Sequence, residues 1–130
     1  MKDSVTRGEV LRDYLSAQVL RCKANFLTSC IMGEEMARAF DAVFIAANSL
    51  LEARFNKNEA RGDPKAAQRA FDDSVVKLGL MKGSGKAESI RYATAIKIIA
   101  NSDAQVSMET ALNQAMQGFA GEKPVVSRLM

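Results

Sequence analysis

The sequence predicts an all-α protein, a long antiparallel helical hairpin over about residues 8–56 with about three shorter helices packed on it. The first long segment contains no proline or glycine, and its apolar residues recur at steps of three and four. Residues typical of helix starts and ends separate the later segments. The 130 residues with 48% hydrophobic content fit one helical domain over 1–130. A tail over 121–130, with Pro124 and little periodicity, is expected to be flexible.

The first helix is predicted from about Val10 to Ile31, with apolar residues on two opposite sides. Its main stripe consists of Leu11, Leu15, Val19, Cys22, Phe26 and Cys30, and its second stripe of Ala17, Leu20, Ala24, Leu27 and Ile31. A helix that is apolar on two sides must be buried on two sides. We therefore predict a homodimer that buries Leu20, Leu27 and Ile31. The alternative is a central helix whose second side is covered by later helices of the same chain.

The second helix is predicted from about Glu34 to Phe55, with Gly33 as the C-terminal cap of the first helix. Glu34 suits a helix N-terminus because negative charge there is favourable. Phe40, Phe44 and Phe55 fall on one face, so this helix is predicted to form the core of the fold. The alternative is one unbroken helix through Gly33, which would need a coiled-coil partner.

The third helix is predicted from Asp63, as N-cap, through Pro64 to about Leu80. The next stretch, 87–100, alternates apolar and other residues in a way that also fits a strand over 90–98. Its length and its alanines favour a helix, and the strand stays open as an alternative.

The last helix is predicted to begin at a cap formed by Ser102 or Asp103. Its apolar residues include Met108, Ala111, Leu112 and Ala115.

The chain contains no histidine, which argues against an enzyme. Serine and cysteine triads with an imidazole base, most zinc sites and the commonest general acid–base residue are excluded. Cys22 and Cys30 lie about 12 Å apart along one helix, too far for an internal disulfide, and both fall on its apolar face. We therefore predict no catalytic residues, no metal ligands and no cofactor.

Residues 83–86 contain glycine and lysine, as a phosphate-binding loop does, but without its spacing. Leu80 stands where that motif requires its first glycine, and Ala87 stands where it requires serine or threonine. We interpret these residues as a turn between helices.

The densest run of positive charge is formed by Lys82, Lys86, Arg91 and Lys97. These four residues are candidate contacts for an anion or a nucleic acid, with Tyr92 as a stacking face for a base. The net charge of +3 is modest, so a solvated helix face is the competing interpretation.

The function predicted from these patterns is a non-enzymatic helical interaction protein, such as an adaptor, inhibitor or assembly factor. Its expected partner is a protein, first of all a second copy of itself. The alternative is a small basic nucleic-acid-binding regulator that uses residues 82–97. The N-terminal residues show no secretion signal and no apolar stretch is long enough to span a membrane, so a cytoplasmic protein without a membrane partner is expected.

Overall fold

The computed structural model describes residues 7–55 and 63–121, and every regular element in these two ranges is an α-helix. The helices are α1 (Arg7–Ser29), α2 (Glu34–Phe55), α3 (Pro64–Leu80), α4 (Lys86–Ala100) and α5 (Met108–Gly121). The predicted all-α class is confirmed. The strand considered for 90–98 is wrong, because α4 covers that whole stretch. The tail beyond Gly121 lies outside the described residues.

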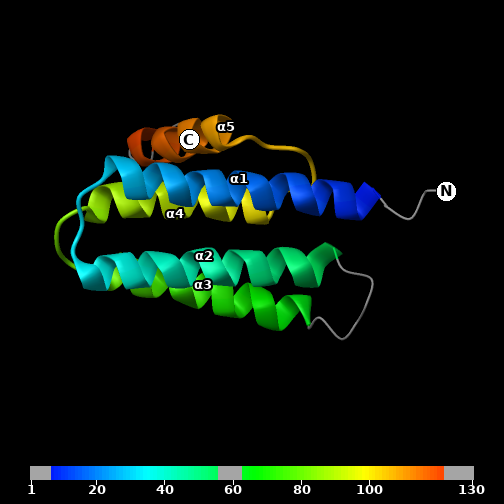
Figure 1. Ribbon diagram of the computed structural model, residues 1–130, viewed down its shortest axis with the longest axis horizontal. Helices are drawn as coiled ribbons and strands as arrows, with labels where there is room; N and C mark the ends of the chain where they lie inside the picture. The colour runs from blue at the N-terminus through cyan, green and yellow to red at the C-terminus, as the bar shows by residue number, and fades with distance from the viewer. Residues whose placement is uncertain (1–6, 56–62, 122–130) are drawn as a thin grey trace.

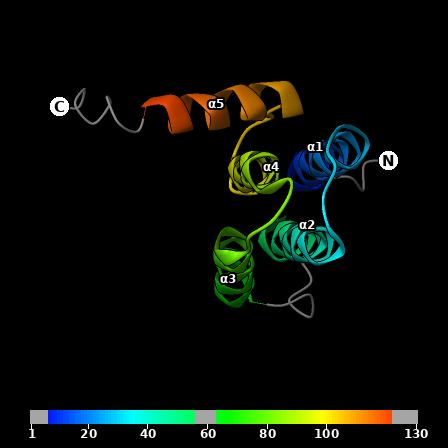
Figure 2. The same ribbon diagram turned by 90° about the vertical axis from the view of Figure 1, so that its left-hand side faces the viewer.

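The first two helices run antiparallel, with α3 beside α2 and α4 beside α1 (Figure 1). Figure 2 looks along these four helices and shows α5 crossing over α4 at a steep angle. The helix at the centre of the contacts is α4, which touches each of the other helices named above. The second helix also contributes to the core as predicted, because it packs against α1, α3 and α4 and buries seven of its residues.

The central position of α4 explains why its sequence was ambiguous. Its buried residues are Ser89, Tyr92, Ala93, Ala95, Ile96, Ile99 and Ala100. A helix enclosed on several sides carries apolar residues around most of its circumference, so a single 3.6-residue stripe is lost. The remaining pattern resembled the alternation of a strand.

The aromatic residues of α2 are buried to different extents. Phe40 is fully buried, and its ring centroid lies 4.2 Å from that of Phe26 in α1. Phe44 and Phe55 are only partly buried. A cation lies over each of these two rings, the Lys23 Nζ over Phe44 at 4.3 Å and the Arg54 guanidinium over Phe55 at 4.5 Å. The prediction of three aromatics in the core holds for one of them.

The turn between α1 and α2 differs from the predicted glycine cap. Positive φ values among the described glycines occur at Gly83 and Gly85, so Gly33 does not adopt the left-handed conformation of a C-terminal cap. Instead, the Gly33 carbonyl accepts the first hydrogen bond of α2, from Ala37 N. The end of α1 is closed by Ser29, whose hydroxyl donates to the Asn25 carbonyl at 2.6 Å.

The turn between α3 and α4 packs against the α1–α2 linker, so the two turns at this end of the bundle hold each other. Gly85 has a φ of 83°, and a β-carbon at this position would lie 2.9 Å from the Ile31 carbonyl oxygen. Glycine is therefore required both for its conformation and for the close approach.

Two further caps set the starts of α3 and α5. Asp63 accepts a hydrogen bond from Lys65 N, as predicted. The cap of α5 is Ser107, whose hydroxyl accepts from Thr110 N at 3.1 Å, and not Ser102 or Asp103. The Asp103 carboxylate instead accepts a hydrogen bond from Arg54, at 2.7 Å.

Candidate functional site on the outer side of α1

The second apolar stripe forms an exposed surface, which we call the α1 outer face: Ala17, Leu20, Ala24 and Leu27 on α1, with Ile31 beside them. Because α1 ends at Ser29, and not at Ile31 as predicted, Ile31 lies in the linker that follows the helix. Leu20 is 56% exposed, Leu27 48% and Ile31 88%. The opposite stripe is in the core, where Leu15, Val19, Cys22 and Phe26 are fully buried.

The later helices do not cover this face within the described part of the chain. Figure 2 shows α1 at the edge of the bundle, with α2 and α4 on its inner side. The alternative of a central first helix is therefore wrong. The homodimer is not tested by a single chain and stays a prediction.

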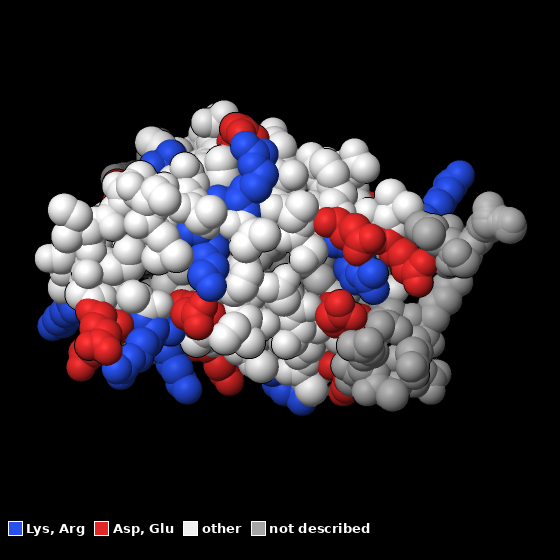
Figure 3. Space-filling view, viewed as in Figure 1, with Lys and Arg blue, Asp and Glu red and all other residues white. Residues whose placement is uncertain are grey.

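One rim of the outer face is formed by polar contacts between α1 and α2. Lys23 Nζ lies 2.9 Å from the Asp41 carboxylate of α2, and Arg12 lies 3.9 Å from Glu52 of α2. Arg12 also lies 3.0 Å from Asp13, its neighbour within α1. Figure 3 shows acidic and basic side chains lying next to each other along this boundary, with uncharged surface beside them. The rim therefore carries charges of both signs in contact.

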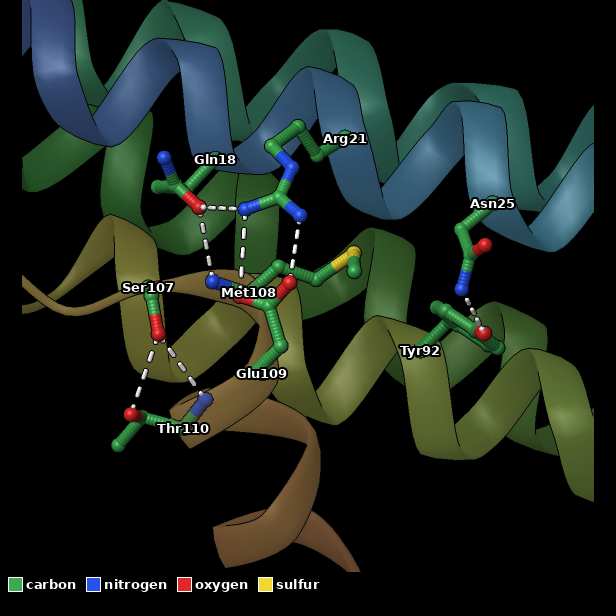
Figure 4. A network of polar contacts seen from close by, with 8 residues as sticks. All are labelled: Gln18, Arg21, Asn25, Tyr92, Ser107, Met108, Glu109 and Thr110. Atoms are coloured by element: carbon green, nitrogen blue, oxygen red, sulfur yellow. Dashed lines mark hydrogen bonds and ion pairs between the residues drawn. The ribbon is translucent and has the colours of Figure 1, made fainter.

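The other rim is formed by contacts between α1 and the start of α5, drawn in Figure 4. Arg21 donates to both carboxylate oxygens of Glu109. This hydrogen bonding raises the pKa of the Arg21 guanidinium and lowers the pKa of the Glu109 carboxyl group. Beside this pair, the side-chain oxygen of Gln18 accepts a hydrogen bond from Met108 N at 2.8 Å. Two neighbouring residues of α1 thus hold the first turn of α5.

A shallow hollow of about 270 Å³ lies between the outer face and α5. It is lined by Arg21, Ala24, Asn25, Thr28 and Met108. Ala24 belongs to the outer face, so protruding leucines and a hollow lie side by side on the same helix.

The four predicted basic contacts do not form one cluster. Lys86 and Lys97 lie at the two ends of α4, about 16 Å apart along its axis. Arg91 lies 3.5 Å from the Glu88 carboxylate, so its charge has an acidic neighbour. Lys82 lies in the turn before α4 and is exposed, as is Lys97.

Tyr92 cannot act as the predicted stacking face. Its side chain is buried, with its ring centroid 5.5 Å from that of Phe26, and its hydroxyl accepts a hydrogen bond from Asn25 at 2.7 Å. A base could reach the ring only after α1 and α4 separated. The basic region therefore lacks the aromatic platform expected of it.

Nothing around Cys22 or Cys30 lowers the pKa of its thiol overall. Burial raises the pKa of Cys22 to about 12 and also raises the pKa of the partly buried Cys30. A thiol with a raised pKa is a poor nucleophile at neutral pH, because the thiolate is the reactive form. Within the described ranges, no three histidine, cysteine or carboxylate residues are placed to hold a metal ion.

Sequence reasoning missed the residues that attach α5. Gln18 lies at steps of three and four from Leu15 and Cys22, so a polar residue interrupts the buried stripe. That interruption was the available signal, because a buried amide needs a hydrogen-bond partner. The identity of the partner, ninety residues away at Met108, had no signal in the sequence.

No protein-family model, curated protein or solved structure matches this chain. None of the helices in the described ranges is long and apolar enough to cross a membrane.

Proposed function

We propose that this protein works by protein–protein contact through the α1 outer face, as an adaptor, inhibitor or assembly factor, and not by catalysis. The observation that carries the proposal is the exposure of Leu20 and Leu27 on one side of α1, with Ile31 exposed just beyond the end of the helix. The opposite side of α1 is in the core, where its central residues are fully buried. Large apolar side chains that line up on a surface mark interaction sites more often than isolated ones do. A second copy of the chain is the proposed partner.

The charge around the face supports a protein partner. Arg12, Arg21 and Lys23 each lie beside a carboxylate of the same chain. A surface whose cations are paired in this way offers little attraction to a polyanion, and it does not repel a second copy of itself.

Sedimentation equilibrium at micromolar protein concentrations tests this proposal. We expect the wild-type chain to dimerise and Leu20→Glu to be monomeric, because the substitution places a charge in the middle of the face. Ile45→Glu is the matched control, since Ile45 is 57% exposed on α2 and lies outside the face. A monomeric wild-type chain contradicts self-association, and equal loss of dimer in both variants contradicts the location.

The competing proposal is a nucleic-acid-binding regulator that uses Lys82, Lys86, Arg91 and Lys97. Their separation and the burial of Tyr92 leave it with less support. Binding to phosphates weakens steeply as salt rises. If the chain retains nucleic acid at low salt, and a variant with Lys82, Lys86 and Arg91 changed to Ala does not, this function replaces the one proposed above.

A further inference from the structure

We propose that two copies of the chain pack α1 against α1 in antiparallel orientation, about a two-fold axis that passes α1 near the level of Cys22. This inference rests on the proposed function and deepens it, because it names the occupant of the outer face and its register. In this arrangement Ala17 lies opposite Leu27 of the second copy, and Leu20 lies opposite Ala24 of the second copy.

The spacing of the face supports two packed helices. Residues 17, 20, 24 and 27 of α1 follow steps of three, four and three, the spacing of the contact seam in a coiled coil. All four are exposed, although α1 is already packed on its other side. The seam is about 15 Å long from Ala17 to Leu27, which accommodates a short helix–helix contact.

The alternation of small and large residues favours the antiparallel orientation. Along the seam, alanines 17 and 24 alternate with leucines 20 and 27. In a parallel pair each residue meets its own copy, so layers of two alanines would leave voids between layers of two leucines. In the antiparallel pair every layer contains one alanine and one leucine. Layers of equal volume pack without voids, which the close packing of protein interiors requires.

The hollow beside Ala24 makes the face self-complementary. Leu20 of the second copy lies over Ala24 in this register, at the edge of the hollow lined by Asn25, Thr28 and Met108. A two-fold interface uses the same patch on both subunits, so it needs protrusions and hollows within one patch. The outer face has both.

The rims are compatible with this orientation. The two-fold axis brings Arg21 of each copy near Arg21 of the other, and each arginine is paired with Glu109 of its own chain. Each arginine charge is therefore balanced by a carboxylate of its own chain, and the two Arg21–Glu109 pairs, related by the two-fold axis, do not repel each other strongly. The seam has four residues on each side, against roughly 20–30 per partner in a standard interface, so we expect a weak dimer that depends on concentration.

Disulfide crosslinking tests the orientation in the full chain with Cys30→Ser, which leaves the buried Cys22 as the native thiol. Ala17→Cys and Leu27→Cys are made as separate proteins, oxidised alone and as a mixture, and separated on non-reducing gels. In the antiparallel dimer the two copies of position 17 are about 15 Å apart along the helix, beyond the reach of a disulfide. We expect crosslinked dimer to be at least tenfold more abundant in the mixture than in either protein alone.

The outcomes separate this inference from the proposed function. Crosslinking of Ala17→Cys with itself would show a parallel pair and overturn the inference, while self-association through the face would stand. A dimer in sedimentation that crosslinks in no sample would also overturn the inference. A chain that sediments as a monomer at all concentrations would contradict both the antiparallel dimer and the proposed self-association.

Discussion

The Gln18 side chain in α1 accepts a hydrogen bond from the backbone nitrogen of Met108, the first residue of α5, at 2.8 Å. The first amides of a helix have no partner within the helix, so a buried acceptor from another helix satisfies one of them. The same Gln18 oxygen accepts from Arg21 at 3.1 Å, and Arg21 in turn holds Glu109. The start of α5 is therefore fixed to α1 by side chains and not by a local cap alone.

Gln18→Leu should destabilise the protein by about 1–3 kcal/mol, because it leaves a buried donor without its acceptor. The volume of the side chain is nearly unchanged, so the loss reports on the hydrogen bond. Urea denaturation at fixed protein concentration measures the change. Gln114→Leu, at an exposed position of α5, is the control and should change stability little. Equal midpoints for Gln18→Leu and wild type would show that this bond contributes nothing to stability.

Gly85→Ala and Gly79→Ala should change stability in opposite directions. Gly85 has a positive φ and no room for a β-carbon beside the Ile31 carbonyl, so alanine there should cost about 2 kcal/mol or more. Gly79 lies inside α3 with nothing within 4 Å of an added β-carbon, so alanine should stabilise the helix by about 0.5–1 kcal/mol. Thermal or urea unfolding of the two variants checks both signs. A stable Gly85→Ala would mean that the two turns do not pack as described.

Tyr92→Phe and Tyr92→Ala distinguish a core residue from a nucleic-acid contact. Tyr92 packs on Phe26 and accepts a hydrogen bond from the partly exposed Asn25. Removing the hydroxyl should cost about 1 kcal/mol, since water can replace it at Asn25. Removing the ring should cost about 3–5 kcal/mol. Denaturation midpoints test the order, and a Tyr92→Ala variant as stable as wild type would place the ring outside the core.

The helix boundaries were largely predictable because their signals are local. Asp63 followed by Pro64 marks the start of α3 within a few residues of sequence, and the predicted range of α2 agrees with the structure. Gly33 was misleading because a glycine between two helices can end the first or begin the second. The backbone conformation that decides between these roles is set by how the turn packs, and here Gly85 lies against the linker at Ile31 and Met32.

The arrangement of the helices was less predictable, because it depends on contacts between distant residues. The central position of α4 follows from its packing against helices on several sides, and such a helix loses the one-sided stripe that reveals orientation. Arg54 donates to the Ser102 carbonyl and to the Asp103 carboxylate. The two residues predicted to cap α5 therefore bind the end of α2 instead. The exposed stripe of α1 was predictable as a stripe. Its exposure could be found only from the structure.

The two cysteines should differ in reactivity and in their effect on pH dependence. Cys22 is fully buried, and burial raises its pKa from 9.0 to about 12, whereas Cys30 is partly accessible. A thiol reagent should therefore modify Cys30 in the native protein and Cys22 only in denaturant.

Because the pKa of Cys22 is higher in the folded than in the unfolded protein, its contribution to stability is fully present below pH 9 and is lost as the pH rises toward 12. Stability measured by urea denaturation should fall above pH 9, and Cys22→Ala should show a shallower fall than wild type. Rapid labelling of both thiols in native protein, or identical pH profiles for the two proteins, would contradict the burial of Cys22.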